Sequence, residues 1–89
     1  VYWALVEGEL AGDAGVCEDW LRKVPDEPRA ERSKEGEPGA KLAMLEYRVL
    51  RPLADRTLVE LLPLTGRMHQ LRVQMAWRGH PVLGDEMYG

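Results

Sequence analysis

The chain has 89 residues, 45% of them hydrophobic and 30% charged, which is ordinary for one small globular domain. No apolar run approaches the roughly 18 residues that a membrane span needs, and the single Cys17 excludes an internal disulfide framework. The formal net charge of −3 argues at first against a nucleic-acid partner, but residues 1–40 carry 5 basic and 10 acidic side chains, whereas residues 41–89 carry 7 and 5. We therefore expect any phosphate-binding surface in the second half. The cysteine usage favours a reducing, cytoplasmic setting.

The first predicted element is a strand over residues 1–7. These residues are rich in β-branched and aromatic side chains, and the run stops at Gly8. Because a domain rarely opens in the middle of a strand, we expect residues 1–89 to be the C-terminal portion of a single domain, truncated at both ends.

Residues 9–39 give weaker signals. Gly12 and Gly15 interrupt the first part, and residues 17–21 fit either a short strand or one helical turn. Residues 24–39 contain three Pro, two Gly and alternating charges with almost no apolar side chains, which is typical of a mobile loop.

Two further strands follow. Residues 41–50 alternate in a way that predicts a strand largely buried on one side, and residues 51–56 predict a turn. Residues 57–62 then form the next strand, most simply an antiparallel neighbour of the one before.

The last predicted element is a helix from about Arg67, with Thr65 as its N-cap. Gly79 lies where a left-handed C-cap belongs, and Pro81 blocks continuation. Residues at helical spacing predict a stripe facing the core, namely Met68, Leu71, Met75 and Ala76. Strands interleaved with one helix after the Thr65-Gly66-Arg67 turn predict an α+β fold with mainly antiparallel strands.

The turn before this helix is the strongest chemical feature. Gly66 permits a tight turn, the helix N-terminus attracts negative charge, and Arg67 can hold a carboxylate or phosphate with two hydrogen bonds. The alternative is a surface arginine beside an ordinary capped helix.

The polar residues after the turn allow two interpretations. His69, Gln70 and Arg72 either contact the backbone of RNA, or His69 and Gln70 are buried and hold the loop at Gly84-Asp85. His69 and His80 are too isolated to form a metal site, so no metal is expected.

Four blocks of the sequence, in order, resemble one family. They are residues 2–8, 43–50, 62–72 and 76–89, and the most specific part is Thr65-Gly66-Arg67-Met68-His69-Gln70-Leu71-Arg72. This pattern resembles the catalytic domain of the RluA-like RNA pseudouridine synthases. The resemblance implies part of the pseudouridine synthase fold and isomerisation of uridine to pseudouridine in ribosomal or transfer RNA, without a metal or organic cofactor. RNA is then the expected partner, and a monomer the expected state.

The same resemblance implies roles for two residues. It places the active-site tyrosine at Tyr2, where the ring stacks on the flipped-out base, and the active-site arginine at Arg67, paired with a nucleophilic Asp. Without the resemblance, an aromatic residue near the start of a strand, such as Tyr2, is more typical of a packing residue than of a catalytic one. We interpret Trp3, Trp20 and Trp77 as packing residues. The nucleophile belongs to an H-R-L-D segment that this sequence lacks. We therefore expect that Asp in sequence preceding Val1, and the 89 residues alone to be inactive.

Two other hypotheses compete with the enzyme. One is a non-catalytic RNA-binding relative with the same fold, which the missing H-R-L-D segment would suit. The other is a protein-interaction module without an RNA role, which would make the four ordered blocks an accident.

Overall fold

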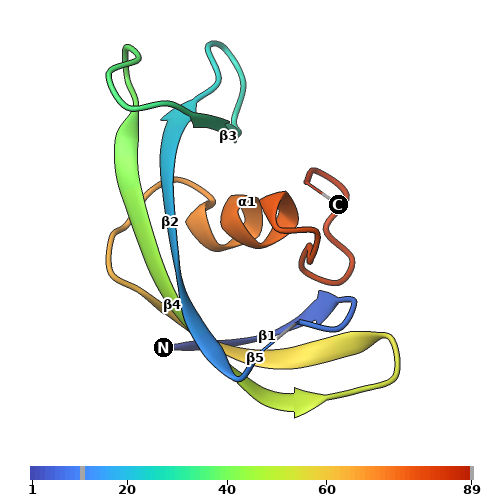
Figure 1. Cartoon of the computed structure of the whole chain (residues 1–89). Coiled ribbons are helices and arrows are strands. Elements are labelled where there is room, and N and C mark those ends of the chain that lie inside the picture. The colour runs from blue at the N-terminus through green and yellow to red at the C-terminus, as the bar shows by residue number, and fades with distance from the viewer. Residues whose placement is uncertain (11, 89) are drawn as a thin grey trace.

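The core of the fold is a five-stranded sheet with one helix against one of its faces (Figure 1). These elements come from a computed structural model that describes residues 1–10 and 12–88. Their bounds are β1 Tyr2–Glu7, β2 Ala14–Lys23, β3 Ala30–Ser33, β4 Lys41–Pro52, β5 Arg56–Pro63 and α1 Gln70–Trp77. The strands lie in the order β1-β5-β4-β2-β3, and every neighbouring pair is antiparallel. The predicted α+β class, with mainly antiparallel strands and one helix, is confirmed.

Alternating side chains explain which face of the sheet is covered. In β4, Ala43 and Leu45 are fully buried, whereas Glu46, the residue after Leu45, is exposed. Paired residues of antiparallel strands share a face, so the buried Val59 and Leu61 of β5 lie on the same side. Met75 of α1 completes this cluster, which places the core between the sheet and the helix. The core is small, because one eight-residue helix covers it.

The weak signals of residues 9–39 conceal two strands. β2 is a ten-residue strand, so the interpretation of residues 17–21 as a strand is right and the helical turn is wrong. β3 lies within residues 24–39, which we predicted to be a loop throughout. The prediction fails because β3 has few apolar residues, yet Ala30 is 3% exposed and packs with Leu21. Pairing with β2, rather than local composition, orders this segment.

The predicted strand ends shift by a few residues. β4 continues to Pro52 and β5 begins at Arg56, so the predicted turn over residues 51–56 narrows to residues 53–55. A register shift between Val49 and Arg51 lets the longer β4 keep its pairing with β5.

The helix differs from the prediction at its start. α1 begins at Gln70 rather than Arg67, and its N-cap is His69, in the left-handed conformation with φ 50°. Thr65 is not the cap, because its hydroxyl donates to the side-chain oxygen of Gln70, 2.8 Å away. At the other end Gly79 is left-handed as predicted, with φ +83°, and its N–H donates to Ala76.

The predicted core stripe is only partly right. Met75 is fully buried, but Met68 precedes the helix and is 42% exposed. The buried residues of α1 are Gln70, Val73, Gln74 and Met75. The later helix start changes the buried face, and the two glutamines tolerate burial because their amides find hydrogen-bond partners. Trp3 and Trp77 are 68% and 57% exposed, so the packing prediction is wrong for both.

The closing segment, residues 80–88, runs from the helix back to the sheet. Val82 forms an isolated antiparallel bridge with Val6, and the N–H of Leu83 donates to the carbonyl of Leu5. The predicted end of the family pattern at Gly89 lies outside the described residues. Within the part of the chain described here, no helix is long and apolar enough to cross a membrane.

Candidate active site

The turn between β5 and α1 is held in place by one buried side chain. Gln70 is 4% exposed, and its amide nitrogen donates to the carbonyl of Met44 in β4, 2.8 Å away. Its side-chain oxygen accepts the backbone N–H of Arg67 at 3.0 Å and the Thr65 hydroxyl. A single amide thus ties the turn to the sheet and fixes the backbone from which Arg67 projects.

Arg67 lies in this turn, ahead of the helix, with its side chain partly buried. Its Nε donates to the carbonyl of Leu42 in β4 at 2.8 Å. This bond orients the planar guanidinium and leaves its two terminal nitrogens for another acceptor. The side chain lines a cavity of about 350 Å³ together with the neighbouring Gly66 and Met68. Arg67 thus projects from the turn and not from the first turn of the helix, and its role in holding an anion stays a prediction.

Three further cations line the same cavity, which we name the basic cavity. Arg22 and Lys23 come from the end of β2, and Lys41 comes from the start of β4. The sequence analysis missed all three, because two belong to the acidic half of the chain. The pairing of Leu21 with Lys41 in the sheet is what brings them together.

His69 and Arg72 are joined to the closing segment. Nδ1 of His69 lies 2.8 Å from the hydroxyl of Tyr88, and the two rings meet edge to face with centroids 5.7 Å apart. Nε and Nη2 of Arg72 each donate to one carboxylate oxygen of Asp85, both at 2.9 Å. These hydrogen bonds from Arg72 lower the pKa of Asp85 to about 2 and raise the pKa of Arg72.

These contacts bear on the two interpretations of the polar residues. The buried amide of Gln70 and the bond from His69 to Tyr88 agree with the alternative in which they hold neighbouring segments in place. The helix does hold the loop at Gly84-Asp85, but through Arg72. That His69, Gln70 and Arg72 contact RNA stays a prediction.

Tyr2 lies at the same end of the sheet as the turn. It pairs with Leu61, two residues before β5 ends at Pro63, and β5 leads directly into the turn that carries Arg67. Its side chain is 57% exposed, so it is no core residue and its ring is accessible to a partner. No hydrogen bond joins Tyr2 to Arg67 among the residues that the structure describes.

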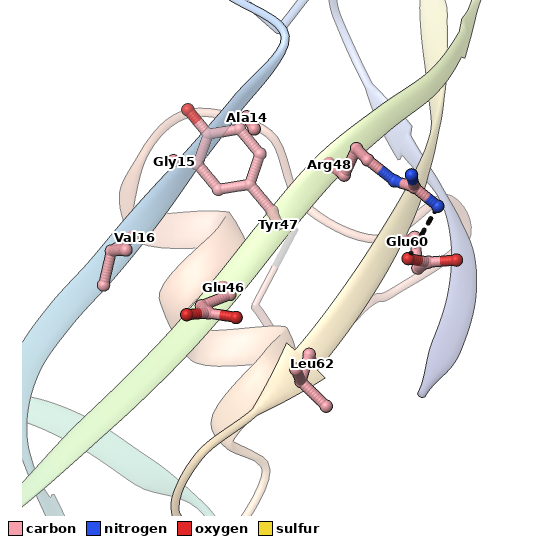
Figure 2. A pocket seen from close by; sticks show the side chains of 8 residues that line it. All are labelled: Ala14, Gly15, Val16, Glu46, Tyr47, Arg48, Glu60 and Leu62. Carbon is pink, nitrogen blue, oxygen red and sulfur yellow. Dashed lines mark hydrogen bonds and ion pairs between the residues drawn. The ribbon is translucent and has the colours of Figure 1, made fainter.

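A second hollow of about 490 Å³ lies on the face of the sheet turned away from α1 (Figure 2). Its polar centre is the exposed ion pair of Arg48 and Glu60, with a nitrogen–oxygen distance of 3.0 Å. The Tyr47 ring lies against Gly15 beside it. No residue of the turn or of α1 contributes to this hollow, so the basic cavity is the better candidate site.

A metal site has no support in the geometry. Across residues 1–10 and 12–88, no group of three or more His, Cys, Asp or Glu side chains is placed to hold an ion. The only cysteine, Cys17, is buried, and burial raises the pKa of its thiol.

The fold and this site define an α+β domain whose cationic cavity lies beside an oriented arginine. Comparison with known proteins narrows this class. Residues 1–77 match the family described as RNA pseudouridylate synthase, and the chain belongs to that family. The resemblance to the RluA-like enzymes is therefore confirmed.

Individual relatives agree in sequence and in structure. The chain is 37% identical over 89 residues to the ribosomal large subunit pseudouridine synthase D of Borreliella burgdorferi, covering 100% of the chain and 27% of that protein. It is 43% identical over 88 residues to the dual-specificity RNA pseudouridine synthase RluA of Yersinia pestis, covering 98% and 42%. The solved structure of human RNA pseudouridylate synthase domain containing 1 superposes with a TM-score of 0.80 at 34% identity, covering 98% of this chain and 39% of that one. The chain thus spans less than half the length of these relatives.

Proposed function

We propose that the protein containing these residues isomerises uridine to pseudouridine in structured RNA, either ribosomal or transfer RNA. The observation that carries this proposal is the orientation of Arg67 by Leu42 and Gln70. The resemblance assigns the active-site arginine to this residue. Membership of the family and the names of the relatives support the reaction. Cytoplasmic location, the absence of a cofactor and the monomeric state remain expectations.

Each candidate residue has a part in this proposal. The terminal nitrogens of Arg67 pair with the carboxylate of the nucleophilic Asp, which none of the chain's own aspartates supplies in an H-R-L-D context. Tyr2 stacks its exposed ring on the flipped uracil. Gln70 and His69 act by supporting the turn, and the half-exposed Arg72 can still offer a nitrogen to a phosphate.

Replacing Arg67 tests the reaction directly. We expect Arg67→Ala, in the complete gene product, to slow pseudouridine formation by about 10²–10³-fold, because a preorganised charge beside the reacting carboxylate is lost. Arg67→Lys should recover only part of this, since an ammonium cannot make both the Leu42 bond and a bidentate pair. The measurement is single-turnover conversion of uridine in ribosomal and transfer RNA.

Arg51→Ala is the matched control, because Arg51 is exposed near the end of β4 and outside the cavity. Unchanged turnover in Arg67→Ala, with unfolding temperatures equal to wild type, would contradict the assignment. Wild-type protein that binds RNA but converts no uridine would favour the non-catalytic relative. An H-R-L-D segment in the complete gene, whose Asp→Asn variant is inactive, would favour the enzyme.

A further inference from the structure

Four cations from three separate segments converge on the basic cavity. Arg22 and Lys23 end β2, Lys41 opens β4, and Arg67 projects from the turn after β5. The sheet register places Lys41 opposite Leu21, immediately beside Arg22. The convergence is a product of the fold, because these residues are up to forty-five positions apart in the sequence.

Most of this positive charge has no internal partner. Arg22 is paired with Glu31 at 2.6 Å and more loosely with Glu37 at 3.7 Å. In the part of the chain that the structure describes, Lys23 and Lys41 form no ion pair, and the side chain of Arg67 donates only to a backbone carbonyl. Cationic residues around one cavity repel each other, and their repulsion is relieved when an anion enters.

The size and accessibility of the cavity narrow the choice of anion. A volume of about 350 Å³ is ample for a phosphate with its attached sugar. Lys23 and Lys41 are exposed, so their ammonium groups can follow a flexible strand as point charges. Arg67, whose proposed partner is the carboxylate of the nucleophilic Asp, lines the same cavity.

We propose that the basic cavity holds a phosphodiester of the RNA strand next to the target uridine, with Lys23 and Lys41 as its principal contacts. This inference rests on the proposed function, and it places the main contact with the RNA backbone at Lys23 and Lys41 rather than at His69, Gln70 and Arg72. Arg67 then lies between the held phosphate and the reacting carboxylate. The site would set the position of the strand without reading its sequence.

The salt dependence of RNA binding tests this placement. The probe is a short RNA stem–loop with uridine in its loop, titrated with the complete gene product over a range of salt concentrations. Lys41→Gln and Lys23→Gln should each lower the slope of log Kd against log salt by about 0.7–0.9, the counterions released per phosphate contact. At roughly 0.1 M salt the same loss weakens binding about fivefold. Lys34→Gln is the control, since it removes the same charge from a lysine outside the cavity.

A single neutral methylphosphonate in the loop locates the contact. Next to the target uridine it should weaken wild-type binding, and it should have a clearly smaller effect in the Lys23→Gln/Lys41→Gln double variant. The inference is overturned if the salt slopes of RNA binding in both lysine variants equal that of Lys34→Gln. It is also overturned if the lysine variants weaken binding of another polyanion, polyglutamate, but leave RNA binding unchanged.

The two proposals can fail separately. If the wild-type protein converts uridine but the Lys23 and Lys41 variants bind RNA as Lys34→Gln does, only this inference is wrong. Wild-type protein that neither binds nor converts ribosomal or transfer RNA defeats both. Both lysines are exposed, and circular dichroism of each variant verifies that the fold is retained.

Discussion

At the scale of single residues, Asp85 shows how one carboxylate organises a segment that lacks regular structure. Its side chain is 3% exposed and accepts two hydrogen bonds from Arg72. One of its oxygens also accepts the backbone N–H groups of Met87 and Tyr88. The carboxylate form is stabilised by these donors, so the pKa of Asp85 falls to about 2 from an ordinary value of 3.8.

This pair predicts a component of stability that depends on pH. A lowered folded-state pKa stabilises the protein above the unfolded pKa near 3.8, and this stability is lost as the pH falls toward about 2. We expect Asp85→Asn to remove on the order of 1–2 kcal/mol of pH-dependent stability in that window, after allowance for the 37% exposure of Arg72. Urea unfolding at several pH values between about pH 5 and pH 2 measures this part of the free energy of unfolding. Asp55→Asn is the control, because Asp55 is 80% exposed; equal pH profiles for the two variants would refute the prediction.

The anion-holding role proposed for Arg67 illustrates what local sequence can and cannot reveal. Its residue type beside Gly66 was enough to predict a site. Its orientation depends on the carbonyl of Leu42 and the amide of Gln70, and no local pattern encodes a bond across twenty-five residues. Lys23 and Lys41 were missed for the same reason, because only the sheet register brings them to one cavity.

At the scale of elements, α1 is attached to the sheet through polar contacts as well as apolar ones. Asp19 of β2 is 4% exposed and accepts hydrogen bonds from Arg78 at 2.6 Å and Gln74 at 3.0 Å. Burial would raise the pKa of Asp19, but these two bonds and the charges of Arg78 and Arg32 together lower it. The C-terminal half of the helix is thereby fixed to β2.

Removing one partner should therefore be costly. We expect Arg78→Met to destabilise the protein by about 2–4 kcal/mol, because a buried carboxylate loses its closest cation and keeps only Arg32, 3.4 Å away. Arg78→Lys should lose less. Arg56→Met, which removes an exposed pair, should change the free energy of unfolding by under about 1 kcal/mol. Chemical unfolding at neutral pH compares them, and similar losses for Arg78→Met and Arg56→Met would be inconsistent with a buried network.

Elements were predictable where the pattern was strong. β1 is rich in β-branched and aromatic residues, and the side chains of β4 and β5 alternate because one face packs on the core. β3 was not predicted because Ala30 is its only buried residue. The helix begins later than predicted because His69 takes a left-handed conformation, which interrupts the helix before Gln70. In both cases a tertiary contact, rather than intrinsic propensity, decides the local structure.

At the scale of the whole molecule, the sheet has one covered and one open face. Trp3, Val16 and Leu62 lie on the face away from α1 and are 68%, 57% and 40% exposed. The register explains their grouping, since Val16 and Leu62 both pair with Glu46. Exposed apolar side chains on one open face of a sheet favour association with another surface.

The 89-residue polypeptide expressed on its own should consequently self-associate. Sedimentation velocity over a range of concentrations should show a rising mean mass. A variant with Trp3→Thr, Val16→Thr and Leu62→Thr should remain smaller, because threonine keeps the strand propensity while removing apolar area. The control carries Leu53→Thr and Leu83→Thr, at exposed positions outside these strands. If the control reduces association as much as the triple variant, the open face is not responsible.

The closing segment connects the two opposite edges of this sheet. Near its start, Val82 pairs with β1 at one edge, and near its end the hydroxyl of Tyr88 accepts the N–H of Ala30 in β3 at the other. The consequence concerns the order of assembly on the ribosome. Among the described residues, the contacts of the outer side of β1 and of the Ala30 amide both come from residues 80–88, which follow them in the sequence. These contacts with the two edges of the sheet can therefore form only after residues 80–88 have been synthesised.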